Sequence, residues 1–174
     1  MKYKVIDNFL DEEYFDSLVT LFTDKEKPAN QCMPWYLDFS VSFPNDFEHV
    51  VQEKNNLFYM YHMIYNENVP MSPYYEKMIP ILEKLDAKCL VRIKANLFPN
   101  TEILHEHSPH IDYDFSHSGA IFSLNTCDGY TKLKDGTKID SVANRILLFN
   151  SAEEHAATTT TNDFARFNIN VNYI

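Results

Sequence analysis

Glycine is scarce in this chain, with three residues among 174, well below the average usage of about 7%. Loops that cradle phosphate groups need glycines at set spacings, because only glycine lets the backbone approach the phosphates closely. Neither Gly-x-Gly-x-x-Gly nor Gly-x-x-x-x-Gly-Lys occurs anywhere in the sequence. Nucleotide-dependent chemistry of those kinds is therefore excluded.

Cysteine is also rare, and its pattern excludes a disulfide framework. Cys32, Cys89 and Cys127 are odd in number, far apart in sequence and not arranged as Cys-x-x-Cys. Small secreted domains that rely on disulfides carry an even set at close spacings. We predict three reduced thiols in an intracellular protein.

Positive charge and long apolar runs are missing as well. The net charge is −10, and no run of consecutive Lys and Arg residues is longer than two, so the electrostatic footprint of a nucleic-acid or membrane partner is absent. Residues 2–7 are too polar for a signal peptide, and the apolar stretch 57–65 is interrupted by His62 and too short to span a bilayer. We expect a soluble, cytoplasmic protein.

Two segments of the first half show helical periodicity. One begins after Asp11, a plausible N-cap, and carries an apolar stripe through residues 14–22; the other begins at Ser72-Pro73 and contains Pro80, where we predict a kink or restart. The compositions of 35–43 and 55–65 are typical of strands.

After residue 88 the pattern changes to the alternation of β-strands. Strands are predicted at 89–98, 118–126, 130–133, 137–141, 143–149 and 164–173, with a hairpin turn at 134–136. Helices followed by closely spaced strands indicate a mainly β fold, a sheet sandwich or barrel with supporting N-terminal helices on one outer face. We expect one domain, 1–174, with 1–88 as support and 89–174 as the β core.

The last predicted strand has two contrasting faces. Its apolar face carries Phe167, Ile169, Val171 and Tyr173, and its polar face carries Arg166, Asn168, Asn170 and Asn172. Asparagine is a poor strand former without a hydrogen-bond partner. We therefore expect the polar face to line a cavity and the apolar face to meet the helices, although a solvated polar face is the alternative.

A possible metal site lies between His105 and Asp114. His110 and Asp112 are two residues apart, so in extended backbone both side chains leave the same face. His155 follows 43 residues after Asp112 and supplies a third ligand. Two histidines and one carboxylate leave open coordination positions, the arrangement of non-haem Fe(II) oxygenases.

Other ionisable residues in the same stretch compete with this interpretation. His105, His107 and His117 are nearby in sequence, and Asp114 could replace Asp112 if the register slipped. Only His110 and Asp112 stand at His-x-Asp spacing. We interpret His105 and His107 as polar loop residues at the mouth of the site.

The ordered set of motifs resembles a known enzyme family. His110-x-Asp112, His155 and Arg166, with Asn-Leu-Phe-Pro at 96–99 and Arg-Phe-Asn-Ile-Asn at 166–170, are similar to the Fe(II)/2-oxoglutarate-dependent dioxygenases. The closest likeness is to small prolyl-4-hydroxylase-like members, including those of bacteriophages and marine microbes. The resemblance covers roughly 89–174 at motif level, and earlier residues match only in a strand-helix opening.

This resemblance implies a double-stranded β-helix, a cupin-like jelly roll. It implies that His110, Asp112 and His155 bind Fe(II), that Arg166 pairs with the distal carboxylate of the cosubstrate 2-oxoglutarate, and that O2 takes the last position on iron. The implied reaction hydroxylates a C–H bond with release of succinate and CO2. If a phage encodes the chain, the implied location is the host cytoplasm.

Two departures from the family pattern bear on the site. Phe98 stands where many members have a tyrosine whose hydroxyl meets the cosubstrate, and some prolyl hydroxylases have lysine where this chain has Arg166. Asn96, Asn168 and Tyr130 are further candidates for contacts to the ligands or the cosubstrate. Tyr130 is as well explained as an ordinary hairpin residue.

The sequence leaves other functions open. One alternative is a cupin-like, non-oxidative metal enzyme with Zn(II) or Mn(II), which would not need Arg166. Another is a metal-free jelly-roll binding module, in which His110, Asp112 and His155 would lie too far apart to coordinate. Among substrates, a prolyl peptide, another amino acid, a small molecule and a damaged nucleobase all suit the same core, and the acidic charge disfavours nucleic acid.

Overall fold

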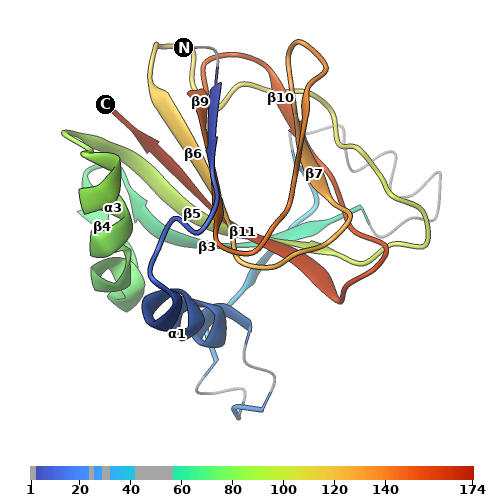
Figure 1. Ribbon diagram of the computed structural model, residues 1–174, viewed down its shortest axis with the longest axis horizontal. Helices are drawn as coiled ribbons and strands as arrows, with labels where there is room; N and C mark the ends of the chain where they lie inside the picture. Colours follow the sequence, from blue (N-terminus) through green and yellow to red (C-terminus); the bar gives the residue numbers. More distant parts are fainter. Residues whose placement is uncertain (1–2, 24–25, 29–31, 42–56) are drawn as a thin grey trace.

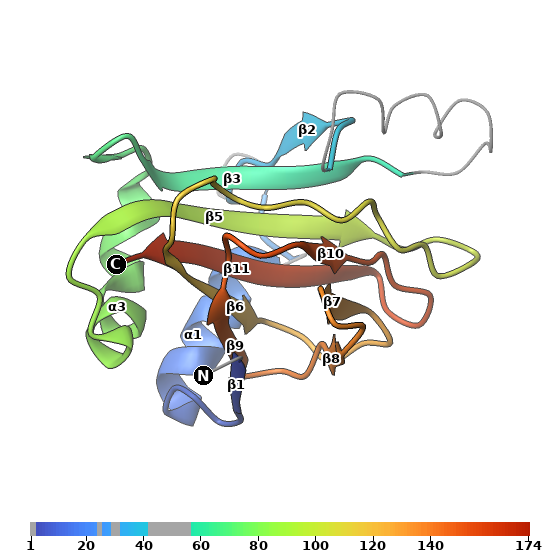
Figure 2. The same cartoon turned by 90° about the horizontal axis from the view of Figure 1, so that it is seen from above.

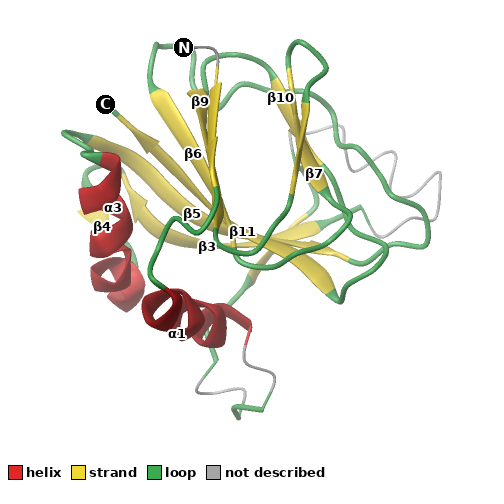
Figure 3. Ribbon diagram, in the orientation of Figure 1, coloured by secondary structure: helices red, strands yellow, loops and turns green. Residues whose placement is uncertain are grey.

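The computed structural model describes residues 3–23, 26–28, 32–41 and 57–174 of the chain, and Figures 1 and 3 show it as two β-sheets with helices against one of them. The helical elements are α1 (Glu12–Thr23), the 3-10 helix η2 (Pro73–Met78) and α3 (Ile79–Leu85). The strands are β1 (Tyr3–Ile6), β2 (Tyr36–Asp38), β3 (Tyr59–Asn66), β4 (Val69–Pro70), β5 (Leu90–Pro99), β6 (Ser118–Ser123), β7 (Tyr130–Leu133), β8 (Lys138–Asp140), β9 (Arg145–Asn150), β10 (His155–Ala157) and β11 (Ala165–Tyr173).

The larger sheet runs in the order β1-β9-β6-β11-β5-β3-β2, with β4 paired to β3, and all of these pairings are antiparallel. Strand β11 lies at its centre between β5 and β6, although β11 is the last strand of the chain. Strands β1 and β3, from the first half of the chain, pair with β9 and β5. The last strand of the chain therefore joins the two halves of the larger sheet.

The smaller sheet is antiparallel, in the order β10-β7-β8, and it faces the larger one (Figure 2). The β7–β8 connection is the predicted hairpin, in which Gly136 has a φ of +86° and donates its N–H to the carbonyl of Leu133 at 2.8 Å. Only glycine adopts this conformation without strain. Strands of both sheets, β5 and β11 on one side and β7 and β10 on the other, line one cavity.

The helices begin where the sequence predicts. The Asp11 carboxylate accepts a hydrogen bond from the N–H of Tyr14 at 2.9 Å, as an N-cap does. The Ser72 hydroxyl accepts one from the N–H of Tyr74 at 3.2 Å. The predicted restart at Pro80 is confirmed, because η2 ends at Met78 and α3 begins beside the proline.

The helices pack on the outer face of the larger sheet (Figure 1). Phe15, Leu18 and Phe22 of α1 and Ile81 of α3 join one buried apolar cluster with Ile169 of β11. Apolar burial of this kind is the main favourable term in folding. The helices thereby hold the central strand of the sheet from behind, while its other face points to the cavity.

Several elements differ from the prediction. The strand expected at 35–43 covers only 36–38, with 42–43 outside the described residues; the one expected at 55–65 covers 59–66, with 55–56 outside them. Strand β10 was not predicted, because Thr158–Thr161 and Glu153–Glu154 hide its short apolar part. The helical support is not confined to the N-terminus, since η2 and α3 occupy 73–85.

None of Cys32, Cys89 and Cys127 forms a disulfide. Within the described residues, every helix is too short or too polar to traverse a lipid bilayer.

Candidate metal centre

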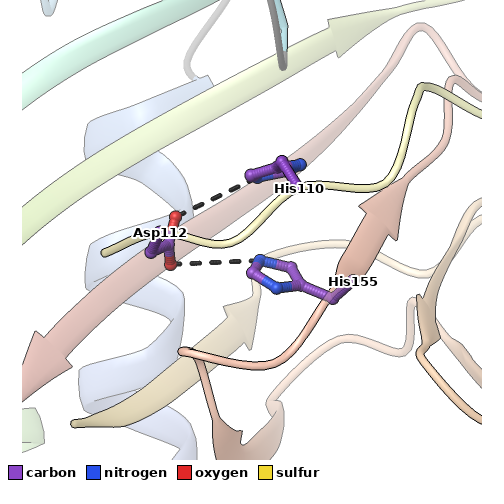
Figure 4. A group of neighbouring side chains, drawn as sticks. All are labelled: His110, Asp112 and His155. Carbon is purple, nitrogen blue, oxygen red and sulfur yellow. Dashed lines mark ion pairs between the residues drawn. The ribbon is translucent and has the colours of Figure 1, made fainter. Parts of the chain in front are cut away.

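Three side chains from two segments of the chain converge at one point (Figure 4). The Nε2 atom of His110 lies 4.0 Å from Oδ1 of Asp112, and the Nε2 atom of His155 lies 3.9 Å from Oδ2. One ligand atom from each of the three lies within 4.8 Å of the others. The structure thus brings together the three residues that the His-x-Asp spacing and the later histidine suggested.

Backbone hydrogen bonds set this convergence. His110 and His155 form an isolated antiparallel bridge in which each N–H donates to the carbonyl of the other at 2.9 Å. The N–H of Asp112 donates to the carbonyl of Ser151 at 3.1 Å. The loop that carries the His-x-Asp motif is therefore fastened to the segment leading into β10, so both parts of the site are held in register.

Four polar side chains surround the carboxylate of Asp112, which is 4% exposed. Arg92 Nη2 donates to Oδ1 at 2.8 Å, whereas Ser151 Oγ and Asn170 Nδ2 donate to Oδ2 at 2.6 and 3.2 Å. The amide of Asn172, in the orientation that satisfies its neighbours, donates to Oδ2 at 3.0 Å. Such contacts orient a ligand and tune its affinity for metal.

The protonation states suit metal binding. Burial, together with the nearby His155, lowers the pKa of His110 to about 4; burial also lowers the pKa of His155. Burial by itself would raise the pKa of Asp112, but the Arg92 cation, the nearby His155 ring and the Ser151 hydroxyl hold it well below its usual range. At neutral pH the cluster offers two neutral imidazoles and one carboxylate.

The imidazole of His155 is also oriented for a metal. Its Nδ1 lies 3.1 Å from the carbonyl oxygen of Glu153. A carbonyl can only accept, so Nδ1 carries the proton and Nε2, which faces Asp112, keeps its lone pair. The donor set and its orientation fit a divalent metal such as Fe(II), with coordination positions left over for exogenous ligands.

The cluster opens into the cavity between the sheets. His110, Asp112 and His155 line it, and the remaining wall comes from both sheets. The other lining residues are Val41, Tyr59, Lys94, Asn96, Phe98, Ile121, Thr131, Ala156, Ala157, Asn168 and Asn170. Of the polar face of β11, Asn168 and Asn170 therefore line the cavity, whereas Arg166 and Asn172 are not among its lining residues.

Arg166 lies beside this cavity and is 1% exposed. Its guanidinium donates to Thr131 Oγ1 and to the carbonyl of Tyr130, both at 2.8 Å, and lies 5.7 Å from the ring centre of Phe98. Thr131 and Phe98 line the cavity, whereas Arg166 itself stands behind them. No carboxylate among the described residues pairs with Arg166, and its Nε has no hydrogen-bond partner.

Burial without a counter-ion lowers the pKa of Arg166 to about 10, so the group remains charged at neutral pH. A buried, unpaired cation is costly unless an anion completes it. Gly129 makes room for it, because a Cβ at that position would lie 2.7 Å from the Arg166 Cδ. The residues thus fit a group that brings a carboxylate to this end of the cavity.

Asn96 and Asn168 face each other across β5 and β11. Asn96 Nδ2 donates to Asn168 Oδ1 at 2.9 Å, and Asn96 Oδ1, although buried, has no partner. Both side chains line the cavity between the metal cluster and Arg166. An unsatisfied buried polar atom at this point is a second sign that a polar ligand belongs there.

A tyrosine lies beside Phe98, the residue at the position where many 2-oxoglutarate-dependent dioxygenases have tyrosine. The ring of Tyr59, from β3, stacks on Phe98 with centroids 5.7 Å apart. Burial raises the pKa of the Tyr59 hydroxyl, so it stays neutral. Tyr59 thus comes from the strand adjacent to β5. Because strand pairing brings it there, the spacing of residues in the sequence cannot reveal this contact. Tyr130 acts differently: its hydroxyl donates to Glu106, away from the cavity.

The competing histidines are not part of the cluster. His107 lies in a loop, as expected, but it is buried against Phe98 with ring centroids 5.6 Å apart, so it is not exposed at the mouth of the site. His117 is buried beside Asn172 at 3.1 Å. Asp114 is exposed. Among the described residues, the metal-ligand group consists of the His-x-Asp pair and His155.

Sequence reasoning missed Arg92, Lys94 and Ser151. The first two share a face of β5 with Asn96, so the alternation of that strand could have found them. Ser151 stands four residues before His155 in a turn and carries no such signal. Burial, together with the nearby charge of Arg92, lowers the pKa of Lys94 to about 8.

Comparisons with known proteins agree with this architecture. No family model matches the sequence, and no curated protein matches it. An oxidoreductase of the 2OG-Fe(II) oxygenase family from Burkholderia pseudomallei superimposes with a TM-score of 0.67 at 11% identity, covering 98% of this chain and 84% of that one. The epimerase SnoN from nogalamycin biosynthesis, described as non-heme and alpha ketoglutarate dependent, gives 0.62 at 14% identity, covering 99% and 77%.

A viral collagen prolyl hydroxylase from Paramecium Bursaria Chlorella virus-1 gives a TM-score of 0.53 at 13% identity, covering 100% of this chain and 97% of that one. At these identities the likeness concerns the fold. The fold that the motifs implied is confirmed: the chain has the β architecture of 2OG-Fe(II) oxygenases and prolyl hydroxylases.

Proposed function

We propose that the protein is an Fe(II)- and 2-oxoglutarate-dependent dioxygenase that hydroxylates a C–H bond, with release of succinate and CO2. The observation that carries this proposal is the pairing of two features in one cavity. Two neutral imidazoles and a carboxylate converge within 4.8 Å at one point, and a buried guanidinium without a carboxylate partner lies beside the same cavity.

In this proposal His110, Asp112 and His155 hold the iron, and Arg166 binds the distal carboxylate of 2-oxoglutarate. Bound iron, with the keto acid and O2, supplies the oxidising chemistry. Thr131 and the carbonyl of Tyr130 hold the guanidinium of Arg166 in place. Asn96, whose Oδ1 lacks a partner, and Asn168 contact the polar middle of the cosubstrate.

The protein's remaining task is to keep the ligands oriented and the cavity dry. Arg92 and Ser151 hold the Asp112 carboxylate so that it does not rotate away from the imidazoles. Gly119 permits this contact, because a Cβ there would meet the Ser151 Cβ at 2.5 Å. Ile121 and Phe98 supply the apolar part of the wall.

The two alternatives fit the site less well. A metal-free binding module would leave the three side chains apart, but their ligand atoms lie within 4.8 Å. A non-oxidative metal enzyme has no use for a buried guanidinium, and burying one without an anion carries a cost. Hydroxylation of a prolyl or other amino-acid residue is favoured among substrates by the fold shared with the viral prolyl hydroxylase.

The test is a metal exchange with a direct product assay. Metal-free protein receives Fe(II), Zn(II) or Mn(II), with 2-oxoglutarate and air, and succinate is measured alone and with proline-containing peptides or free amino acids. We expect succinate only with Fe(II), and more of it with a substrate. Turnover of another compound by the Zn(II) protein, with no consumption of 2-oxoglutarate, would favour the cupin-like alternative.

A further inference from the structure

Lys94 stands out among the cavity residues because the proposed reaction leaves it without a task. Its side chain lines the cavity together with the three metal-binding candidates. Its Nζ lies 3.4 Å from the Tyr59 hydroxyl and 5.2 Å from the centre of that ring. Among the described residues, no carboxylate oxygen lies within ion-pair distance of Nζ.

The strand register places Lys94 at the metal end of the cavity. Lys94 pairs with Asn170 across β5 and β11, and Asn170 donates to Asp112. Arg166 pairs with Phe98, which lies four residues after Lys94 on β5. The backbone positions that carry the side chains of Lys94 and Arg166 are therefore about 13 Å apart along the strands. In the proposed reaction, 2-oxoglutarate has three carbons between its carboxylates and places one carboxylate at the metal and the other at Arg166. Lys94 therefore remains available.

The hydrogen bond of Lys94 goes to a different group from those that hold Asp112. Asp112 receives hydrogen bonds from Asn170 of β11 and from Ser151, whereas Lys94 contacts Tyr59 of β3. Arg92, the other cation on this face, is engaged by Asp112 at 2.8 Å. The ammonium of Lys94 is partly buried beside the metal-binding candidates, in a chain whose net charge is −10. A cation in this position favours the binding of an anion.

We propose that Lys94 binds a carboxylate of the substrate, so that the enzyme acts on an acid whose carboxylate lies close to the C–H bond presented to the metal. This inference rests on the proposed function. The carboxylate belongs either to a free amino acid or peptide C-terminus, or to an acidic side chain next to the reacting residue. Both sources share the chemistry that Lys94 recognises. The Tyr59 hydroxyl accepts a hydrogen bond from Nζ and donates one to Asp38 Oδ2, both at 3.4 Å, so it orients the ammonium.

The test compares compounds that differ only in this carboxylate. The pairs are L-proline and L-prolinamide, N-acetyl-L-proline and its amide, and end-capped peptides containing Pro-Glu or Pro-Gln. Each is titrated calorimetrically, without oxygen, into protein loaded with Fe(II) and 2-oxoglutarate, and each is then assayed for stimulated succinate release. The first two pairs report a terminal carboxylate, and the third reports an acidic side chain.

We expect at least one acid to bind about tenfold or more tightly than its amide, the effect of one charge-assisted hydrogen bond. Lys94→Met should abolish this preference, Lys94→Arg should keep most of it, and Lys88→Met, which removes an exposed charge, should resemble the wild type. The affinity for 2-oxoglutarate should be unchanged in all of them.

Other outcomes overturn the inference. Equal binding of acids and amides, no binding by any acid of the series, or a preference that survives in Lys94→Met would exclude a substrate carboxylate at Lys94. Weaker 2-oxoglutarate binding in Lys94→Met would assign Lys94 to the cosubstrate instead. If the wild type with Fe(II) binds no 2-oxoglutarate at all, the proposed function itself fails, which the first titration reveals separately.

Discussion

The two faces of strand β11 are both buried, yet different forces hold them. Phe167, Ile169 and Val171 pack against the helices in the apolar cluster, where burial itself is favourable. Arg166 and Asn168, on the opposite face, are buried at a cost that hydrogen bonds offset only in part, since Arg166 Nε has no partner. The apolar face therefore serves stability, and the polar face serves a ligand.

The largest effect is expected at the carboxylate toward which the polar face points. Asp112→Ala removes the ligand that both imidazoles face, so iron-dependent succinate formation should be abolished. Asp114→Ala, an exposed neighbour, should retain it. Succinate release per folded protein is the measurement. Retained turnover in Asp112→Ala would mean that a different residue binds the metal.

The next change separates binding from folding on the polar face. Arg166→Met should weaken 2-oxoglutarate binding by about 2–5 kcal/mol, because a buried charge pair loses one partner. The free energy of unfolding should stay the same or rise, since an unpaired buried charge is removed. Calorimetry with 2-oxoglutarate and urea denaturation measure the two quantities. Equal losses of cosubstrate binding and iron content would count against the role assigned to Arg166.

The corresponding change on the apolar face of β11 tests stability rather than binding. Ile169→Ala should lower the free energy of unfolding by about 2–5 kcal/mol, because Ile169 is fully buried and a cavity remains. The 2-oxoglutarate affinity of the folded fraction should change little. Ile169→Val, a smaller truncation, should cost about 0.5–1.5 kcal/mol. A stable Ile169→Ala variant that fails to bind 2-oxoglutarate would show that the apolar face also serves ligand binding.

A smaller effect is expected from a residue that only orients a ligand. Ser151→Ala removes the hydroxyl that donates to Asp112 Oδ2 at 2.6 Å, and metal affinity should fall about 10–100-fold. Ser141→Ala, a buried serine that donates to the carbonyl of Asn125 instead, is the matched control. Competition with a chromophoric chelator gives both affinities; equal values would show that Ser151 does not support the site.

The last prediction concerns a pH slope in the stability of the metal-free protein. The pKa of His110 is about 4 in the folded state and about 6.5 when unfolded. Between these values the unfolded chain binds more protons, so the free energy of unfolding should decrease as pH falls from about 6.5 to 4, by up to about 1.4 kcal/mol per pH unit. His110→Asn should flatten this slope in denaturation curves; an unchanged slope would mean that His110 does not titrate this way.

Much of this site could be predicted from local spacing. The alternation of β11 separated its two faces, and His110, Asp112 and His155 could be chosen because the His-x-Asp pattern is local and His155 follows a predicted strand. The contacts of Asp112 could not, because Arg92 and Ser151 reach it through strand pairing and a turn. The burial of His107 and the approach of Tyr59 likewise depend on tertiary packing.

The most direct test is the visible spectrum of the protein without oxygen as Fe(II) and then 2-oxoglutarate are added. We predict a weak charge-transfer band only when both are present, lost in Asp112→Ala. Arg166→Met should require far more 2-oxoglutarate to produce the band. Iron that binds without any band at saturating 2-oxoglutarate would show that the keto acid does not bind at this metal centre.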